Sequence, residues 1–362
     1  MFFIIMLIDL FNHMSVTKLS LLLSIILLFS CQSNIGPKHL DPGKVFSVKD
    51  TLKGIFLEAT LSQDSACYNS LIYTPLGLIC DSGINEEVFF LLDTTRGDKL
   101  SSWGCIGRGP EEMLSTISSD FNISTNNVYV WDLQLNVIHS FSFEDHYNFK
   151  KRDRVIKVKT DLYRIKSIND SLFVVLTFYP KQSLGLVDAT GNFIDKIPYR
   201  VINDKSINYD LKYFSSDIAI SPDKKYVAVK DLWFPSLKLY LINNNKLTLV
   251  WEKMVFKPSF NIVNNWPRIN DDQQTGFGDV QLDQKYIYAL SSGLTIKDIK
   301  ENKDMDCSQS YLLQFDYQGN FIKSYVLDNQ LYLFDITPDG RLLYGLGDDV
   351  MDNRIIKKYT LI

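Results

Sequence analysis

The sequence predicts an all-β protein that forms a six-bladed β-propeller, a ring of small antiparallel sheets. Residues 107–143 follow the order loop, turn, strand, aspartate, turn, strand that a propeller blade requires. A strand followed by a polar turn recurs along the chain at a period of roughly 45–55 residues, which is typical of blades. The chain of 362 residues also holds 19 Tyr and 23 Phe, and both residue types favour strands.

The repeated feature is a strand that ends in a turn rich in Asn, Asp or Gly and is followed by a second strand. Such turns favour hairpins, because these residues adopt a positive φ at low cost. The six copies begin at residues 88, 137, 184, 237, 312 and 355. We expect the innermost strand of four blades to precede its copy, at residues 172–178, 225–230, 286–291 and 340–344. Five or seven blades, or a twisted pair of β-sandwiches, are the alternatives.

Two further segments complete the predicted ring. The last copy reaches residue 362 without an outermost strand, and we expect Gly54–Thr60 to supply that strand and close the ring. The interval between the fourth and fifth copies is longer than the others, which predicts an insertion at Lys257–Gly278. A hairpin turning at residues 74–77 would pair Cys80 with a residue near Leu71. This pairing favours buried thiols over a disulfide between Cys67 and Cys80.

The N-terminus has the pattern of a secretory signal peptide. An apolar run at Leu19–Phe29 follows Lys18 and precedes Ser30-Cys31. We expect residues 1–30 to be the signal, residues 31–44 a tether and residues 45–362 the propeller domain. Residues 1–13 contain no Lys or Arg but do contain Asp9, so we expect translation to start at Met14. The alternative is an uncleaved membrane anchor.

Charge and motif content exclude several functions. The formal net charge is −4 without a basic block, so we predict no nucleic-acid partner. The cysteine spacings match no zinc pattern, and the acidic pairs Asp271-Asp272 and Asp348-Asp349 lack the spacing of a calcium loop. Nucleophile-elbow and phosphate-loop motifs are absent from the sequence. We therefore predict no catalytic residue, no metal and no cofactor, although paired carboxylates for glycoside cleavage need only spatial closeness.

Four residues are candidates for ligand binding. Trp266 and Arg268 lie in the insertion among Asn, Asp and Gln residues, and Trp233 precedes Phe-Pro. Rings beside amides and arginine suit sugar or peptide recognition, because rings stack and amides orient the ligand. Both tryptophans could instead fill space between blades. Arg108 could reach a ligand on the propeller axis or bind carbonyl groups of its own loop.

Three segments resemble known families. Leu28-Phe29-Ser30-Cys31 resembles the lipobox of bacterial lipoproteins, which implies that Cys31 carries the lipid. Residues 107–143 resemble an NHL-type blade. The loop Gly107-Arg108-Gly109-Pro110-Glu111-Glu112 is similar to that of TolB-like six-bladed propeller lipoproteins of Bacteroidetes. It departs from them at Glu111, where a second glycine is common, and at Met113, where Phe is common. The resemblance implies a fold and a location, but no catalytic residues.

We therefore expect a lipoprotein of the bacterial cell envelope, held on the outer membrane through its lipid on the periplasmic or surface side. Its propeller would act as a binding or scaffold module for a protein or glycan partner. The alternatives are a glycan- or peptide-binding accessory protein, or a propeller lyase or glycosidase. Carboxylates that converge with Arg or His at the axial mouth would favour the enzyme, whereas an apolar or aromatic rim would favour binding.

Overall fold

The computed structural model describes residues 39–47, 51–57, 70–81, 87–109, 112–144, 148–151, 155–178, 182–202, 215–301, 309–349 and 353–361. The described residues belong to one compact unit, His39–Ile362. The expected signal peptide, Cys31 and Cys67 lie outside the described residues, and their predictions stay predictions. Within the described part of the chain, neither helix is long and apolar enough to cross a membrane.

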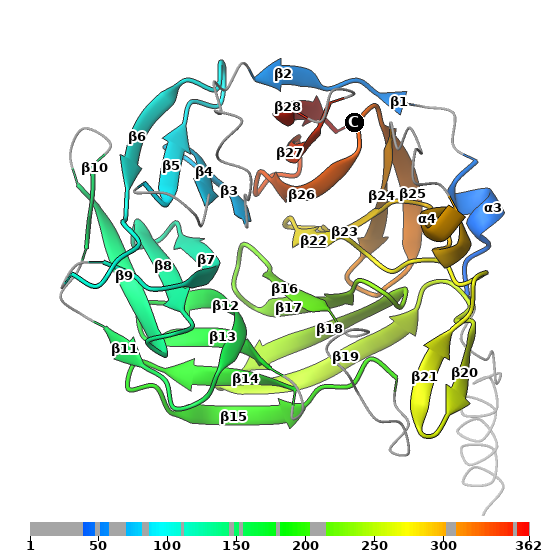
Figure 1. Ribbon diagram of the computed structural model, residues 1–362, viewed down its shortest axis with the longest axis horizontal. Helices are drawn as coiled ribbons and strands as arrows, with labels where there is room; N and C mark the ends of the chain where they lie inside the picture. The colour runs from blue at the N-terminus through cyan, green and yellow to red at the C-terminus, as the bar shows by residue number, and fades with distance from the viewer. Residues whose placement is uncertain are drawn as a thin grey trace, which may run out of the picture. The chain divides into compact units, whose positions relative to one another are not determined.

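In the described residues, six sheets surround a common axis and form the predicted six-bladed propeller (Figure 1). From the axis outward, blade one contains β3 (Ser70–Thr74), β4 (Gly77–Asp81), β5 (Phe89–Leu92) and β6 (Lys99–Trp103). Blade two contains β7 (Thr116–Asn122), β8 (Asn127–Asp132), β9 (Val137–Glu144) and β10 (Asn148–Lys151), and β11 (Ile156–Lys157) also pairs with β9. Blade three contains β12 (Leu162–Asn169), β13 (Leu172–Thr177), β14 (Ser183–Asp188) and β15 (Phe193–Pro198).

The other three blades repeat this order. Blade four contains β16 (Ser216–Ile220), β17 (Tyr226–Asp231), β18 (Ser236–Asn243) and β19 (Lys246–Met254). Blade five contains β22 (Asp279–Leu282), β23 (Tyr286–Ser291), β24 (Ser310–Asp316) and β25 (Phe321–Leu327). Blade six contains β26 (Leu331–Ile336), β27 (Leu342–Asp348) and β28 (Arg354–Thr360). The innermost strand of each blade contacts those of its two neighbours, so these six strands form an inner ring.

An N-terminal strand closes the ring, as predicted. The strand β2 (Ile55–Leu57) pairs antiparallel with β28 and becomes the outermost strand of blade six. The preceding strand β1 (Thr51–Leu52) pairs parallel with β25 and adds a fifth strand to blade five. The N-terminal segment therefore fastens both of the last two blades. The pairing of β1 was not predicted from the sequence.

The expected innermost strands are in fact the second strands of their blades. Residues 172–177, 226–231, 286–291 and 342–348 form β13, β17, β23 and β27, and each of these is one step out from the axis. The true innermost strands precede them and carry more polar residues, such as the sequence SDIAI of β16. A second strand is buried on both faces and therefore has the stronger apolar signal.

The core lies between neighbouring blades. The described residues form six apolar clusters, one at each junction between adjacent sheets. Strand β8 shows how one strand serves two clusters, because its side chains alternate between its two faces. Val128 and Val130 pack towards blade one, whereas Tyr129 and Trp131 pack towards blade three. All six residues of β8 are buried as a result.

The first hairpin confirms the expected register around Cys80. Thr74 and Gly77 bound its turn, and Leu71 pairs with Cys80. Cys80 is a buried free thiol, and burial raises its pKa well above the usual value.

The insertion and the start of the described chain lie together. The strands β20 (Phe260–Val263) and β21 (Trp266–Ile269) form a hairpin that pairs with no blade. The backbone N–H of Leu40 donates to the carbonyl of Val255, just before this hairpin (2.7 Å). A short helix, α3 (Pro42–Val45), follows and buries Val45. The last residues of the expected tether thus pack on the propeller.

Candidate functional site

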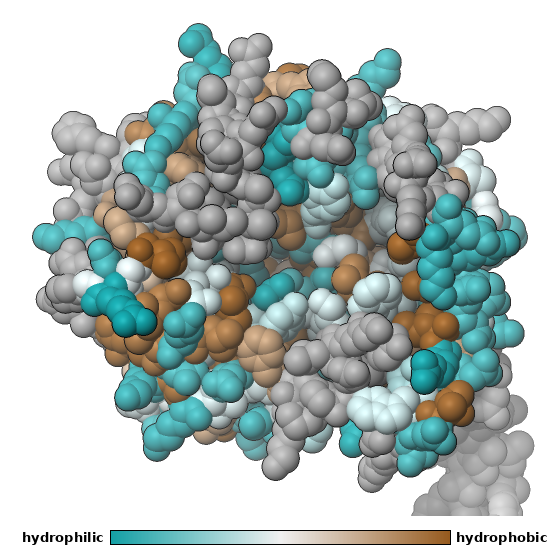
Figure 2. Space-filling model, viewed as in Figure 1, coloured by the Kyte–Doolittle hydropathy of each residue, from teal (hydrophilic) through white to brown (hydrophobic). Residues whose placement is uncertain are grey.

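Charged side chains of the innermost strands line the propeller axis. Residues two apart on a strand share one face, which places Arg164 and Lys166 of β12 on the same side. Figure 2 shows a hollow near the centre of the ring, bordered by hydrophilic and hydrophobic residues. The charged residues that line it are Asp120, Arg164, Lys166, Asp217, Lys224, Asp279 and Asp335.

The axial carboxylates join adjacent blades. Three of them accept hydrogen bonds from backbone N–H groups on the innermost strand of the next blade: Ser167 donates to Asp120 (2.7 Å), Phe334 to Asp279 (2.9 Å) and Tyr73 to Asp335 (2.6 Å). The fourth, Asp217, accepts from the guanidinium Nε of Arg164 in the preceding blade (2.8 Å). Each axial carboxylate therefore has a structural partner in another blade.

Burial raises the pKa of two of these carboxyl groups, whereas neighbouring cations lower that of a third. Burial, followed by the charge of Asp217, raises the pKa of Asp279 to about 7. Burial also raises the pKa of Asp335 to about 6. For Asp217, the charges of Arg164 and Lys230 outweigh burial and hold the pKa below its usual value. The neighbours Asp217 and Asp279 thus differ in charge near neutral pH, because only Asp217 is fully ionised.

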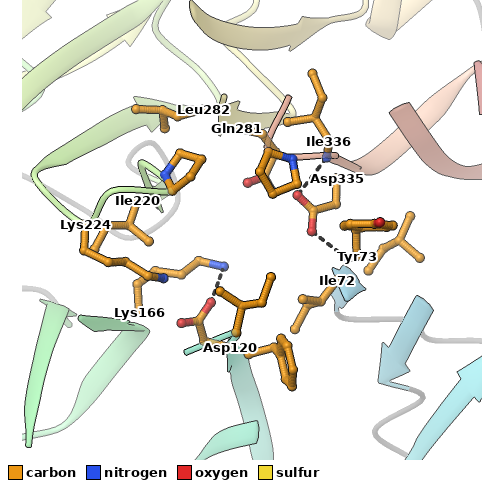
Figure 3. A pocket seen from close by; sticks show the side chains of 15 residues that line it. Ile72, Tyr73, Asp120, Lys166, Ile220, Lys224, Gln281, Leu282, Asp335 and Ile336 are labelled. Atoms are coloured by element: carbon orange, nitrogen blue, oxygen red, sulfur yellow. Dashed lines mark hydrogen bonds and ion pairs between the residues drawn. The ribbon is translucent and has the colours of Figure 1, made fainter. Parts of the chain in front are cut away.

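Two small cavities occupy the axis. We call the side of the ring where the innermost strands begin the N-face, and the side where they end the C-face. The cavity nearer the N-face has a volume of about 50 Å³ and contacts Arg164, Asp217 and Asp279. The cavity nearer the C-face has about 120 Å³, and Lys166, Lys224 and Asp335 point into it (Figure 3). Both are smaller than the roughly 300–1,000 Å³ of ordinary ligand pockets.

A larger pocket of about 360 Å³ lies on the N-face, between blades four, five and six. Trp233, in the turn between β17 and β18, and Tyr332, in β26, provide its aromatic walls. Ile299 of the helix α4 (Ile296–Glu301) adds an apolar edge that is 49% exposed. The other residues that line it are Leu232, Thr275, Gly276, Gly278, Leu290, Ser291, Ser292, Gln330 and Leu331. We call this cavity the Trp233 pocket.

The turn that carries Trp233 is held from two sides. The carboxylate of Asp231 accepts the backbone N–H groups of Trp233 (3.0 Å) and Phe234 (2.9 Å). The end of the insertion lies against this turn, and a Cβ added to Gly276 would lie 2.1 Å from the carbonyl oxygen of Asp231. Only glycine allows so close a backbone approach. The fold itself therefore fixes this wall of the pocket, independently of any ligand.

The opposite wall is fixed by a polar group of three residues. The hydroxyl of Tyr332 donates to Asp348 (2.6 Å), and the guanidinium of Arg354 lies 5.1 Å from the centre of the tyrosine ring. Tyr332 is 38% exposed, so part of its ring faces solvent. Ser292 and Gln330 also line the pocket. The pocket thus combines ring faces with a few hydrogen-bonding groups, as sites for small organic ligands do.

The structure separates the four predicted binding residues. Trp233 lines the pocket and also packs partly against the core between blades three and four. Trp266 and Arg268 lie on β21, where Trp266 is 36% exposed, and neither lines any of these three cavities. Arg108 is exposed in its loop and is likewise outside them. Tyr332 and most of the axial charges were missed, because they lie on innermost strands that the apolar pattern did not reveal, and Lys224 was missed because it lies in the turn after one of them.

The only histidine that the structure places in a blade among the described residues is buried next to an acid. Nε2 of His139 lies 3.6 Å from Asp132, whose carboxylate also accepts the backbone N–H of Leu114 (2.7 Å). Within the described ranges, His, Cys, Asp and Glu side chains form no group of three or more that could hold a metal ion. This pair is therefore part of the packing of blade two.

Comparison with known families agrees with this architecture. A family model described as TolB-like 6-blade propeller-like matches residues 78–339. The chain belongs to this family. The match covers all or part of every blade. A search of curated proteins finds no sequence that matches the chain.

A solved structure shows the same fold at low sequence identity. A Bacteroides fragilis protein that is inferred to be exported is 12% identical, with a TM-score of 0.54, over 90% of this chain and 98% of that one. Hydrazine synthase of Kuenenia stuttgartiensis is also 12% identical, with a TM-score of 0.48, over 81% of this chain and 77% of that one. At such identities the likeness concerns the fold alone.

Proposed function

We propose that this TolB-like propeller is a binding protein of the bacterial cell envelope and that its ligand occupies the Trp233 pocket. The observation that carries the proposal is the pocket itself, which has a volume of about 360 Å³ and is lined by Trp233 and Tyr332. The ligand would place a ring or another flat apolar face against these side chains and would bond to Ser292 and Gln330. A sugar ring and an aromatic peptide side chain both have this chemistry.

The axial groups support binding rather than catalysis. A hydrolytic site needs carboxyl groups that are free to face a substrate. Asp120, Asp279 and Asp335 each accept a backbone N–H from a neighbouring blade, and Asp217 is paired with Arg164. The Trp233 pocket, in contrast, has an aromatic rim. An aromatic rim is the feature that favours a binding module.

The location in the envelope rests on the N-terminal pattern. The apolar run before Ser30-Cys31 resembles a lipoprotein signal, and we propose that Cys31 carries the lipid anchor on the outer membrane. The similarity to the TolB-like family and to a Bacteroides protein that is inferred to be exported is consistent with this placement. Labelling of cells with an alkyne fatty acid tests it, because Cys31→Ser should abolish labelling of this protein.

Thermal unfolding with candidate ligands tests the pocket. The mature protein is heated alone and with oligosaccharides and short aromatic peptides, each at concentrations up to the millimolar range. A ligand that binds only the folded state must raise the unfolding temperature. We expect a rise with one class, and we expect Trp233→Ala to weaken binding of that ligand by about fivefold or more, since stacking on an aromatic ring is worth about 1 kcal/mol or more.

Trp266→Ala is the matched control. Trp266 is also a partly exposed tryptophan on the N-face insertion, but it lies outside the pocket, so this variant should bind as tightly as the wild type. Equal loss in both variants would contradict the assignment of the pocket. Retention of binding in Trp233→Ala would place the ligand elsewhere.

A further inference from the structure

Lys224 has a backbone conformation that is unusual for its residue type. Seven described non-glycine residues have a positive φ; six are asparagine, and the seventh is Lys224 (φ 60°). Asparagine tolerates this left-handed region, whereas the Cβ and long side chain of lysine are disfavoured there. Residues held in such unfavourable backbone conformations cluster at functional sites, which makes Lys224 a candidate for a role beyond the turn.

The corresponding turn of blade six shows the residue that the backbone would prefer. Ser221-Pro222-Asp223-Lys224 joins β16 to β17, and Thr337-Pro338-Asp339-Gly340 joins β26 to β27. The first hydroxyl of each turn donates to its aspartate, and the fourth backbone N–H donates to the first carbonyl. Gly340 occupies the fourth position with φ 71°. Lysine therefore stands where the same turn elsewhere in this ring uses glycine.

The side chain of Lys224 points into the axial cavity nearer the C-face, where Lys166 also points (Figure 3). Among the described residues, the ammonium of Lys224 has no hydrogen bond or ion pair. Burial lowers the pKa of Lys224, and the charge of Lys166 lowers it further, in opposition to Asp120 and Asp335. The cavity thus contains an ammonium group without a direct counter-ion.

The other charged groups of this cavity are already engaged. The ammonium of Lys166 lies 3.4 Å from Asp120, which also accepts the N–H of Ser167. Asp335 accepts the N–H groups of Tyr73 and Ile336. The rest of the wall is largely apolar and consists of Leu71, Ile72, Phe121, Ile123, Ile220, Pro222, Leu282, Ile336 and Pro338, together with Tyr73 and with Gln281, whose amide donates to the carbonyl of Phe334. A negatively charged oxygen in this cavity would therefore find an unpaired ammonium at Lys224 and a second ammonium, shared with Asp120, at Lys166.

We propose that this cavity binds the carboxylate or phosphate group of a small anionic ligand, held between Lys224 and Lys166. Its volume of about 120 Å³ suits one such group and excludes a whole nucleotide or sugar. The cavity lies nearer the C-face and shares no lining residue with the Trp233 pocket, so it constitutes a second site that is independent of the proposed function. The anionic group of the ligand would provide the counter-ion that Lys224 lacks.

Inorganic phosphate and acetate are the probes that test the site. Thermal unfolding of the mature protein is measured at pH 7 with each anion, and sodium chloride keeps the ionic strength constant. We expect a concentration-dependent rise in unfolding temperature with at least one anion. A response to phosphate alone would assign the site to phosphate groups, and a response to acetate alone would assign it to carboxylates.

Lys224→Asn separates binding from folding. Asparagine suits the left-handed turn, so without added anion this variant should unfold at the wild-type temperature or above it. Its anion response should disappear. Lys225→Asn is the matched control, because Lys225 is the next residue but is exposed and pairs with Asp223 (3.4 Å); it should keep the full response.

Three results would overturn the proposal. The first is a wild-type protein that responds to neither anion at tens of millimolar. The second is an equal response in Lys224→Asn, which would assign the effect to other surface charges. The third is a marked fall in the unfolding temperature of Lys224→Asn without anion, because Lys224 would then serve the fold itself.

Discussion

At the scale of single residues, the main polar feature is that buried carboxylates accept hydrogen bonds from the neighbouring blade. Asp279 accepts the N–H of Phe334 in the next blade and lies near Asp217, which is ionised. A buried carboxylate without its own cation costs free energy, and the pKa of Asp279 rises to about 7 as a result. Ionisation of Asp279 at higher pH therefore places a buried negative charge near Asp217 and destabilises the folded state.

The first prediction concerns this pH dependence. The folded state holds a proton on Asp279 up to a pH of about 7, whereas the unfolded chain releases it near 3.8. Between these values the folded state binds more protons, so the free energy of unfolding must fall as the pH rises. We expect Asp279 to contribute a fall of about 2–3 kcal/mol between pH 5 and pH 8, measured by urea unfolding.

Asp279→Asn should remove this contribution, because asparagine does not titrate. The difference in unfolding free energy between pH 5 and pH 8 should shrink by about the same 2–3 kcal/mol. Asp98→Asn is the control, since Asp98 is exposed and the variant should follow the wild-type profile. An unchanged profile in Asp279→Asn would show that Asp279 is ionised throughout this range.

At the scale of elements, the short strand β2 closes the ring. It contains three residues and pairs with the last strand of the chain, so the outer edge of blade six depends on it. Only one of its side chains is buried: Leu57 is 4% exposed and packs between blades six and one. Ile55, two residues earlier, is 68% exposed.

The second prediction uses this contrast within one strand. Leu57→Ala should lower the free energy of unfolding by about 2–3 kcal/mol, because it removes a buried side chain and leaves a cavity at the closing blade. Ile55→Ala should change it by less than about 0.5 kcal/mol, as is usual for exposed positions. Chemical denaturation of both variants provides the measurement. Similar losses in the two would contradict the pairing register of β2.

At the scale of the whole molecule, each blade depends on both neighbours. The six core clusters lie between sheets rather than within them, and the one between blades six and one exists only in the closed ring. A blade separated from its neighbours would expose both faces of its second strand. The ring should therefore lose its structure as one unit.

The third prediction follows from this interdependence. The fluorescence of the five tryptophans, which include Trp103 in blade one, Trp131 in blade two and Trp251 in blade four, should give the same unfolding transition as far-UV circular dichroism. Leu57→Ala should move this single transition to lower denaturant without splitting it. A separate early transition in either signal would show that some blades unfold independently.

The sequence by itself determined the blades, because the information for them is local. The second strands are continuous apolar runs, the turns carry Asn, Asp and Gly, and the spacing repeats along the chain. The closing strand was predictable for the same reason, since the last blade lacked one strand and Gly54–Thr60 had the right pattern. The resemblance of the loop at residues 107–112 to TolB-like propellers pointed to the same family.

Only the tertiary structure decided which residues meet. Trp233 and Trp266 have similar sequence surroundings, yet one lines a pocket and the other lies on a separate hairpin. Lys166 and Lys224 converge on the axis from a strand and a turn of different blades. No local pattern encodes such meetings, because each innermost strand contributes only one or two side chains, and the register between distant strands brings them together.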